Sequence, residues 1–318
     1  MSTEGSEHHV GDALLGPDGH HHAQKDKGLA GGSVGLLGGT VLGISSVAPA
    51  YALTATIGLV VGFAGVKAPI IFIAGFLPMF FAAYAYREFN KVDPDCGTSF
   101  TWTTRAFGPY IGWLGGFVAI IATIIVLANL AAIAVEFFYQ LLGSVFNSEY
   151  VTELAGNTAV NILTCLVFLA LATSVAYRGI TTTEKVQFVL VGFQLLVLAW
   201  FAIAAFTQAG GPDDPDGLSF SWDWFNPFTG LTLTALVAGL GASIFSFWGW
   251  DTALTINEES KDSDKTPGRA ALLCVTSILL TYLLVSIAAM MYAGVGETGL
   301  GLGNPENAEN VFATRPSR

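Results

Sequence analysis

The chain has 318 residues, of which 53% are hydrophobic and 12% are charged, and its formal net charge at pH 7 is −11. This is more apolar surface than one water-soluble core can use, so the composition excludes a soluble globular protein and indicates an all-α integral membrane protein. The acidic residues lie mainly in the tails and connections. We expect a membrane lipid environment and no nucleic-acid partner.

Residues 1–30 are polar and lack the pattern of a signal peptide, so we expect a disordered cytoplasmic tail. All histidines of the chain lie there, which leaves none within the membrane for a proton relay or a metal site. The three cysteines show neither a disulfide framework nor metal-ligand spacing. We therefore expect no cofactor and no metal. The histidines are His8, His9, His20, His21 and His22.

Seven apolar stretches occupy residues 31–296, which we take as one transmembrane domain with seven helices. A hydrocarbon core of about 30 Å requires roughly 20 apolar residues in a helix, and each stretch approaches or exceeds that length. Residues 297–318 are expected to form an extracytoplasmic tail. The predicted spans are 34–62, 68–86, 109–142, 158–177, 185–206, 230–256 and 270–294.

The distribution of lysine and arginine predicts the orientation. With the N-terminus in the cytoplasm, ten of the 13 basic residues fall on the inside, as the positive-inside rule requires. We therefore expect a multi-pass protein of the plasma (inner) membrane with a cytoplasmic N-terminus. The inside residues are Lys25, Lys27, Arg87, Lys91, Arg105, Arg178, Lys185, Lys261, Lys265 and Arg269.

The first and sixth spans contain residues that interrupt helices. Backbone groups at membrane depth must be satisfied by protein or by a water-lined cavity, so an interruption there indicates a site. The two spans are five apart, so each opens a five-helix unit, and an odd number of helices gives the two units opposite topology. Matching breaks in inverted repeats point to a transporter's substrate site. The interrupting residues are Gly43, Ser45, Ser46 and Pro49 in the first span, and Ser246, Gly249 and Asp251 in the sixth.

The helix ends at such breaks predict a zwitterionic ligand such as an amino acid. A half-helix that begins near Ser45 and Ser46 would offer N–H groups to a carboxylate. Half-helices that end near residues 42–43 and 245–246 would offer carbonyl groups to an ammonium group. The alternative is that Pro49 only kinks the first helix and that Gly249 is a packing glycine.

Three motifs stand in or beside the first, third and sixth spans. They are GISSVAPAYA at 43–52, PDCGTSFTWTTRAFGPYIGWLGGF at 94–117 and FSFWGWDTALTINEESKDSDKTPGRA at 245–270. Together they resemble the amino acid, polyamine and organocation superfamily of secondary transporters, over residues 30–300. The resemblance implies two inverted five-helix repeats, alternating access, and an amino acid or related amine as substrate, held by broken helices in spans one and six.

The resemblance also implies roles for individual residues. It places the substrate carboxylate at the break containing Ile44, Ser45 and Ser46. It places aromatic gating at Phe247, Trp248 and Trp250. Plain packing is the alternative for those aromatics, and a solvated helix end is the alternative for the glutamate pair. The expected substrate-binding residues are Gly43, Ile44, Ser45, Ser46, Ser246, Phe247, Trp248, Gly249 and Trp250. The gating or coupling candidates are Asp251, Gln194, Glu258 and Glu259.

The chain departs from the superfamily pattern in two respects. Some proton-coupled relatives carry a lysine in span five where this chain has Gln194, so coupling through that lysine is not expected. Proton coupling, sodium coupling and exchange all stay open. Asn129 and Glu136 are polar residues of span three that merit testing. Members of the superfamily have ten to fourteen helices, so we expect the seven spans to be a truncated form: a complete first repeat and a partial second.

Other classes of membrane protein fit less well. A seven-helix receptor would place its N-terminus outside, against the charge bias, and an intramembrane enzyme would need a catalytic constellation that the spans lack. A receptor-like or binding protein without transport activity is the main alternative to a secondary transporter.

Overall fold

The computed structural model describes residues 31–210 and 217–305. Within these ranges the regular structure is helical apart from one isolated β-bridge, as expected for an all-α membrane protein. The predicted tail of residues 1–30, with its histidines, lies outside the described residues, as do residues 306–318. Five helical stretches of the described part are long and apolar enough to cross a membrane: Pro49–Val92, Pro109–Phe146, Thr158–Tyr177, Ile180–Gln208 and Thr266–Ala293.

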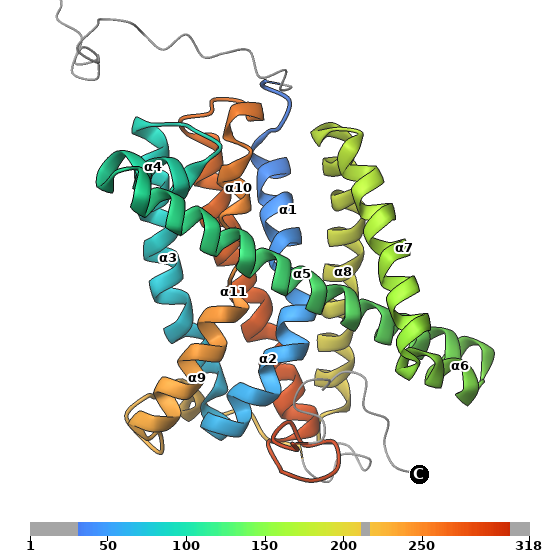
Figure 1. Ribbon diagram of the computed structural model, residues 1–318. Coiled ribbons are helices and arrows are strands. Elements are labelled where there is room, and N and C mark those ends of the chain that lie inside the picture. The colour runs from blue at the N-terminus through green and yellow to red at the C-terminus, as the bar shows by residue number, and fades with distance from the viewer. Residues whose placement is uncertain (1–30, 211–216, 306–318) are drawn as a thin grey trace, which may run out of the picture.

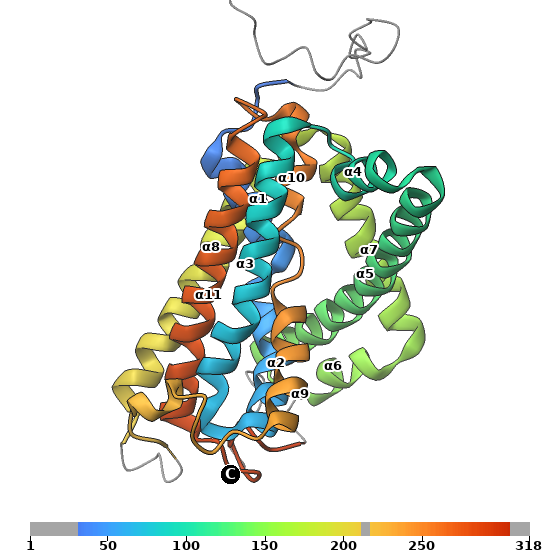
Figure 2. The same cartoon turned by 90° about the vertical axis from the view of Figure 1, so that its left-hand side faces the viewer.

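The helices form an inner bundle and an outer layer (Figures 1 and 2). The bundle contains α1 (Leu36–Val47), α2 (Pro49–Ala64), α3 (Ala68–Val92), α8 (Ile180–Gln208), α9 (Leu233–Ser246), α10 (Thr252–Thr255) and α11 (Thr266–Ala293). The outer layer contains α4 (Thr98–Phe107), α5 (Pro109–Phe146), α6 (Glu149–Glu153) and α7 (Thr158–Tyr177). Short 3₁₀ turns lie at η2 (Gly65–Lys67), η3 (Leu154–Gly156), η4 (Trp222–Phe225) and η5 (Asn257–Glu259).

Close packing of the bundle depends on small residues. Membrane helices have no hydrophobic force between them, so they associate where glycine lets their backbones approach. Gly75 of α3 lies under Ser243 of α9, and Gly239 of α9 lies against Ile71 of α3. Helix α11 packs along α3 and α1, and its Tyr282 is fully buried.

Helix α5 is 38 residues long and crosses the face of the bundle obliquely (Figure 1). A helix much longer than the roughly 20 residues that a membrane requires must tilt or project beyond it. The start of α5 follows from Pro109, which disfavours helical geometry at the preceding residue, and Gly108 there has φ +88°. The predicted connection 86–109 contains helix α4, which the apolar pattern had not indicated.

Capping residues start two further helices. The side chain of Asn157 accepts hydrogen bonds from the N–H groups of Ala159 and Val160 at the start of α7. The side chain of Thr232 accepts from Ala235 N–H at the start of α9. These bonds satisfy first-turn donors that have no partner within the helix.

Backbone and side-chain contacts tie the connections at both ends of the bundle. At one end, Val34 forms a parallel bridge with Ser260: its N–H donates to Glu259 O at 3.0 Å, and Lys261 N–H donates to Val34 O at 2.8 Å. At the other end, Lys67 Nζ lies 2.6 Å from Asp223 Oδ2, and the Lys67 side chain is only 4% exposed. Beyond α11, Leu302 is buried and its N–H donates to Gly294 O, so this part of the predicted tail packs on the bundle.

The glycine packing predicts a specific loss of stability. A Cβ added to Gly75 would lie 2.7 Å from Ser243 Cβ and 3.1 Å from the Ser243 carbonyl carbon. Gly75→Val should therefore lower the free energy of unfolding by about 1–3 kcal/mol, seen as a lower thermal midpoint in detergent by tryptophan fluorescence. Gly62→Val is the matched control, because nothing lies within 4 Å of an added Cβ there. Equal midpoints for the two variants would contradict the packing.

The ion pair at η4 predicts a pH dependence. Hydrogen bonds from Lys67 and Thr229 hold the pKa of Asp223 below its ordinary value. The pair therefore stabilises the fold above the ordinary carboxyl pKa of about 4, and this stabilisation is lost as the pH falls through the lowered pKa. Asp223→Asn should lower the thermal midpoint at pH 7, with the difference shrinking as the pH is lowered from about 5. Asp264→Asn, at an exposed pair, is the control; a pH-independent difference for Asp223→Asn would refute this assignment.

Candidate functional site

The helix of the first predicted span is interrupted at Ala48, which has the left-handed backbone conformation (φ +50°) between α1 and α2. Pro49 has no N–H and disfavours helical geometry at the residue before it, which explains the position of the break. Ala48 N–H donates to Ile44 O, and the next bond of the ladder runs from Ala52 N–H to Ala48 O. The ladder therefore has no donor for the carbonyl groups of Ser45, Ser46 and Val47, and no acceptor for the N–H groups of Ala50 and Tyr51.

The break lies one turn later than the sequence indicated. We expected the first half-helix to end near residues 42–43 and the second to begin near Ser45 and Ser46, but all of these residues lie inside α1. Tertiary contacts explain why the glycine and serines remain helical. Gly43 and Ile44 are buried, with Gly43 against Cys274 of α11, and the Ser45 hydroxyl donates to Gln187 Oε1 of α8. The unpaired amides accordingly belong to Ala50 and Tyr51.

A second interruption separates α9 from α10. Helix α9 ends at Ser246, Gly249 has φ +115°, and α10 begins at Thr252. The expected free carbonyl at Ser246 is already an acceptor: the hydroxyl of Tyr282 donates to it at 2.5 Å, and Tyr282 is fully buried. The Ser246 carbonyl is therefore not a vacant site for an ammonium group, in contrast to the expectation from sequence.

The two interruptions are in contact. A Cβ added to Gly249 would lie 3.0 Å from the carbonyl carbon and oxygen of Ser46, so the backbones of the two segments meet where only glycine fits. The Thr252 hydroxyl donates to Ser46 Oγ at 2.8 Å. Ser46 itself is exposed. Segments about 200 residues apart in sequence thus bring unpaired backbone groups of α1 and α2 beside the α9–α10 connection.

The three aromatic residues of the second interruption have different environments. Phe247 is fully buried, with its ring 5.1 Å from Tyr282 and 6.1 Å from Phe76 between centroids. Trp250 is 5% exposed and makes an edge contact with Tyr86 at 5.2 Å. Trp248 is 40% exposed. In this conformation Phe247 and Trp250 pack between helices, and Trp248 is the member of the three with an exposed side chain.

The four gating or coupling candidates do not form one cluster. Asp251 is half-buried beside Gly249, and its carbonyl accepts the Leu254 N–H of α10. Glu258 accepts the Cys96 N–H at 3.4 Å, whereas the backbone of Glu259 joins the bridge to Val34. This glutamate pair therefore connects η5 with the start of α1 and with the connection before α4. Gln194 lies on α8 and lines a large cavity beside α2.

One group of potential metal ligands is present in the described residues. Ligand atoms of Asp95, Cys96 and Glu258 lie within 4.8 Å of one another. Asp95 Oδ1 already accepts hydrogen bonds from Gly97 N–H and the Thr101 hydroxyl. These contacts make the group a polar junction between η5 and the connection that leads into α4.

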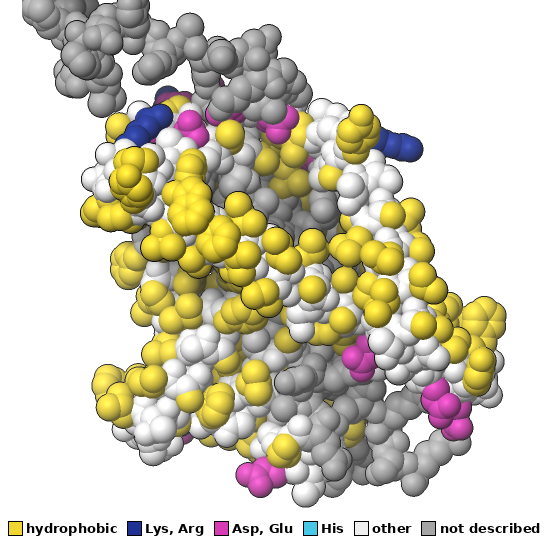
Figure 3. All heavy atoms as spheres, viewed as in Figure 1, with side chains coloured by type: hydrophobic (Ala, Val, Ile, Leu, Met, Phe, Trp, Pro, Cys, Tyr) yellow, Lys and Arg dark blue, Asp and Glu magenta, His cyan; other side chains and the backbone are white. Residues whose placement is uncertain are grey.

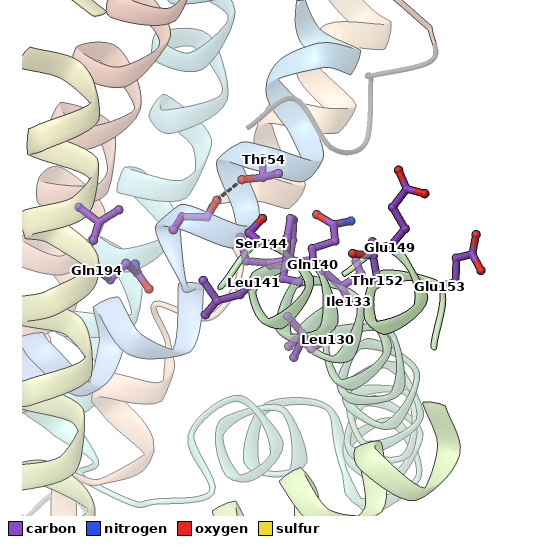
Figure 4. A pocket seen from close by; sticks show the side chains of 15 residues that line it. Thr54, Leu130, Ile133, Gln140, Leu141, Ser144, Glu149, Thr152, Glu153 and Gln194 are labelled. Atoms are coloured by element: carbon purple, nitrogen blue, oxygen red, sulfur yellow. Dashed lines mark hydrogen bonds between the residues drawn. The ribbon is translucent and has the colours of Figure 1, made fainter. Parts of the chain in front are cut away.

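The cavity beside α2 has a volume of about 1150 Å³ and is lined by residues of α2, α5, α6 and α8 (Figure 4). Its lining includes Ala50 and Tyr51, which carry the unpaired amides of the first interruption. The Tyr51 hydroxyl donates to Asn129 Oδ1 of α5 at 2.8 Å, so one of the polar residues noted in span three links the two layers. Glu136, the other, accepts from Gln140 Nε2 at 3.1 Å, one helical turn along α5. The sequence held no signal that α5 would enclose this space, because its oblique course depends on tertiary packing.

The contact between the interruptions predicts a strict requirement for glycine. Gly249→Ala should destabilise the protein by about 1–3 kcal/mol, because alanine tolerates φ +115° poorly and its Cβ meets the Ser46 carbonyl. Gly241→Ala in α9 is the control, since nothing lies within 4 Å of an added Cβ and alanine favours the helix. The thermal midpoint should fall for the first variant and stay level or rise for the second. Equal changes in the thermal midpoint of the two variants would show that the contact between Gly249 and Ser46 does not stabilise the protein.

Comparison with known proteins agrees with this architecture. The family model for amino acid permeases matches residues 32–314. A branched-chain amino acid permease of Lactococcus lactis subsp. cremoris is 23% identical over 233 residues, which cover 70% of this chain and 48% of that protein. A methylthioribose transporter of Bacillus subtilis is 25% identical over 259 residues, which cover 79% of this chain and 54% of that protein. The chain spans about half the length of the curated relatives it matches. Because the family match covers most of the chain, this protein belongs to the amino acid permease family, within the amino acid, polyamine and organocation superfamily.

Proposed function

We propose that this chain forms the substrate-binding part of a secondary transporter, which moves an amino acid or related amine across the plasma membrane by alternating access. The observation that carries the proposal is the contact between the two helix interruptions at Ser46 and Gly249. Unsatisfied backbone groups in a membrane protein are tolerated where they face a cavity or a ligand, and paired breaks of this kind hold the substrate in repeat-built transporters.

The chemistry of the first interruption favours a zwitterion. The N–H groups of Ala50 and Tyr51 stand at the positive end of the α2 dipole, where a carboxylate is stabilised. The carbonyl groups of Ser45, Ser46 and Val47 stand at the negative end of α1, where an ammonium group is stabilised. One ligand that carries both charges on neighbouring atoms satisfies both sets. One relative is named for branched-chain amino acids and the other for methylthioribose. The N–H and carbonyl groups at the interruption favour the amino acid, because it carries both a carboxylate and an ammonium group.

The arrangement of the helices supports inverted repeats. The interruptions occur in the first and sixth predicted spans, so each opens a five-span unit, the first ending with α8 and the second beginning with α9. We propose that the chain supplies the first repeat and the start of the second. The coupling ion, a proton or sodium, would act near Asp251, which is half-buried beside the second interruption.

The surface supports a membrane orientation with residue 31 at the cytoplasmic end. Apolar side chains cover the middle of the face shown in Figure 3, and the visible Lys and Arg side chains lie at its upper end, where α1 begins in Figure 1. Acidic side chains are visible at both ends. A basic cytoplasmic end is the arrangement that the positive-inside rule requires.

Substitution of Ser46 tests the proposal. Ser46→Leu should abolish the rise in thermal midpoint that a bound amino acid causes, because leucine cannot accept the Thr252 hydroxyl and places a larger side chain at the contact between the interruptions, while α1 remains helical. Ser174→Leu, at an exposed position of α7, is the matched control and should bind normally. Both proteins are screened in detergent against the common amino acids and then assayed for uptake in proteoliposomes. An unchanged affinity of Ser46→Leu for the amino acid would contradict the assignment of the substrate site. Amino acid binding without saturable uptake would favour a receptor-like protein.

A further inference from the structure

The cavity between the bundle and α5 carries chemistry that the proposed function leaves unassigned. It extends from the first turn of α2 along the inner face of α5 to α6, and Figure 4 shows Gln194 at one side and Glu149 and Glu153 at the other. Its volume of about 1150 Å³ exceeds what a small polar ligand would fill. The cavity can therefore hold a substrate side chain as well as a carboxylate beside the Ala50 and Tyr51 amides.

The side of the cavity next to α2 presents hydrogen-bond donors. Ala50 and Tyr51 have unpaired N–H groups, and the side-chain nitrogen of Gln194 is buried without a hydrogen-bond partner. A buried donor without a partner is unusual in a protein and requires an acceptor. A carboxylate accepts several hydrogen bonds and carries no donor, so it matches this set.

The wall that α5 gives to the cavity is mostly apolar, and Gln140 and Ser144 are its polar members. Val197 of α8 lines the cavity from the bundle. Apolar side chains offer no partner to a polar group but stabilise an apolar one by its removal from water. The apolar α5 residues of this wall are Leu130, Ile133, Ala134, Phe137 and Leu141.

The opposite side of the cavity is acidic. Glu149 and Glu153 of α6 line it, and the described lining contains no lysine, arginine or histidine. A second carboxylate on the ligand would meet two negative side chains and no positive one. The acidic side therefore disfavours aspartate and glutamate by charge, while the apolar wall disfavours small polar side chains.

We propose that the substrate is an amino acid with an apolar side chain of leucine size or larger, which lies against the α5 wall while Gln194 donates to its carboxylate. This inference rests on the proposed function above and adds the substrate class. Leucine, methionine and phenylalanine should bind at least tenfold more tightly than glutamate, glycine or serine.

Reshaping of the wall tests the inference. Ile133→Phe narrows the cavity, so the Kd for leucine and phenylalanine should rise at least tenfold while the Kd for alanine changes less than threefold. Ile125→Phe is the matched control, because Ile125 lies on α5 with an exposed side chain outside the cavity lining. Val197→Phe narrows the same space from α8 and replaces Ile133→Phe if that variant does not fold.

Removal of the Gln194 side-chain amide tests its contact with the substrate carboxylate separately. Gln194→Leu should raise the Kd for leucine at least tenfold, but should leave the weak binding of leucinol, which lacks the carboxylate, unchanged. Kd values come from thermal shift and isothermal titration on the purified chain in detergent. Equal losses for leucine and leucinol would assign Gln194 a structural role and overturn its assignment.

The outcomes separate this inference from the proposed function. If amino acids bind and Ser46→Leu abolishes binding, but glutamate or glycine binds most tightly or Ile133→Phe affects leucine and alanine equally, then the inferred substrate class is wrong and the proposed function stands. If no amino acid binds to the wild-type chain, both are wrong. Preference for large apolar side chains that is lost in Ile133→Phe and kept in Ile125→Phe supports both.

Discussion

The missing N–H group of Pro49 is the constraint on which the centre of this structure depends. A helix that continued through Pro49 would lack a donor for the Ser45 carbonyl, and Pro49 disfavours helical geometry at the residue before it. The chain leaves helical geometry at Ala48, whereas α3 continues through Pro78. Unpaired backbone groups are costly in hydrocarbon, so the rest of the bundle must accommodate them. The second interruption meets the first at Gly249, and the lack of a side chain there allows the two backbones to come together.

Small residues also determine how closely the helices around this centre pack. Gly75 and Gly239 let α3 and α9 approach each other, and Gly43 lets α11 approach α1. Each contact holds one flank of the interruptions in a fixed position. The oblique helix α5 stands farther off, and the space that remains between the layers is the cavity beside α2. Close packing in the bundle and loose packing against α5 are therefore complementary: the first positions the polar groups, and the second leaves room in front of them.

Sequence patterns predicted the all-helical membrane character and the superfamily, because apolar length and the motif at 43–52 are local properties. The predicted span 158–177 has the same bounds as α7, whose start is set by Asn157 nearby in sequence. The position of the first interruption was predicted one turn too early, since glycine and serine propensities were given more weight than tertiary contacts. The hydrogen bond of Tyr282 to Ser246 and the place of Gln194 in the cavity lining could not be predicted, because each depends on a helix remote in sequence.

The bridge between Val34 and Ser260 makes α1 part of a lever. Helix α1 has 12 residues and is about 18 Å long, with Ala48 at one end and the bridge just before the other. Because η5 is hydrogen-bonded to the bridge, a rotation of α1 about Ala48 would carry η5 with it as one arm. The fulcrum coincides with the position of the unpaired amides. A small angular change at the fulcrum would therefore become a larger displacement at the far end of α1, while the unpaired amides would hardly move.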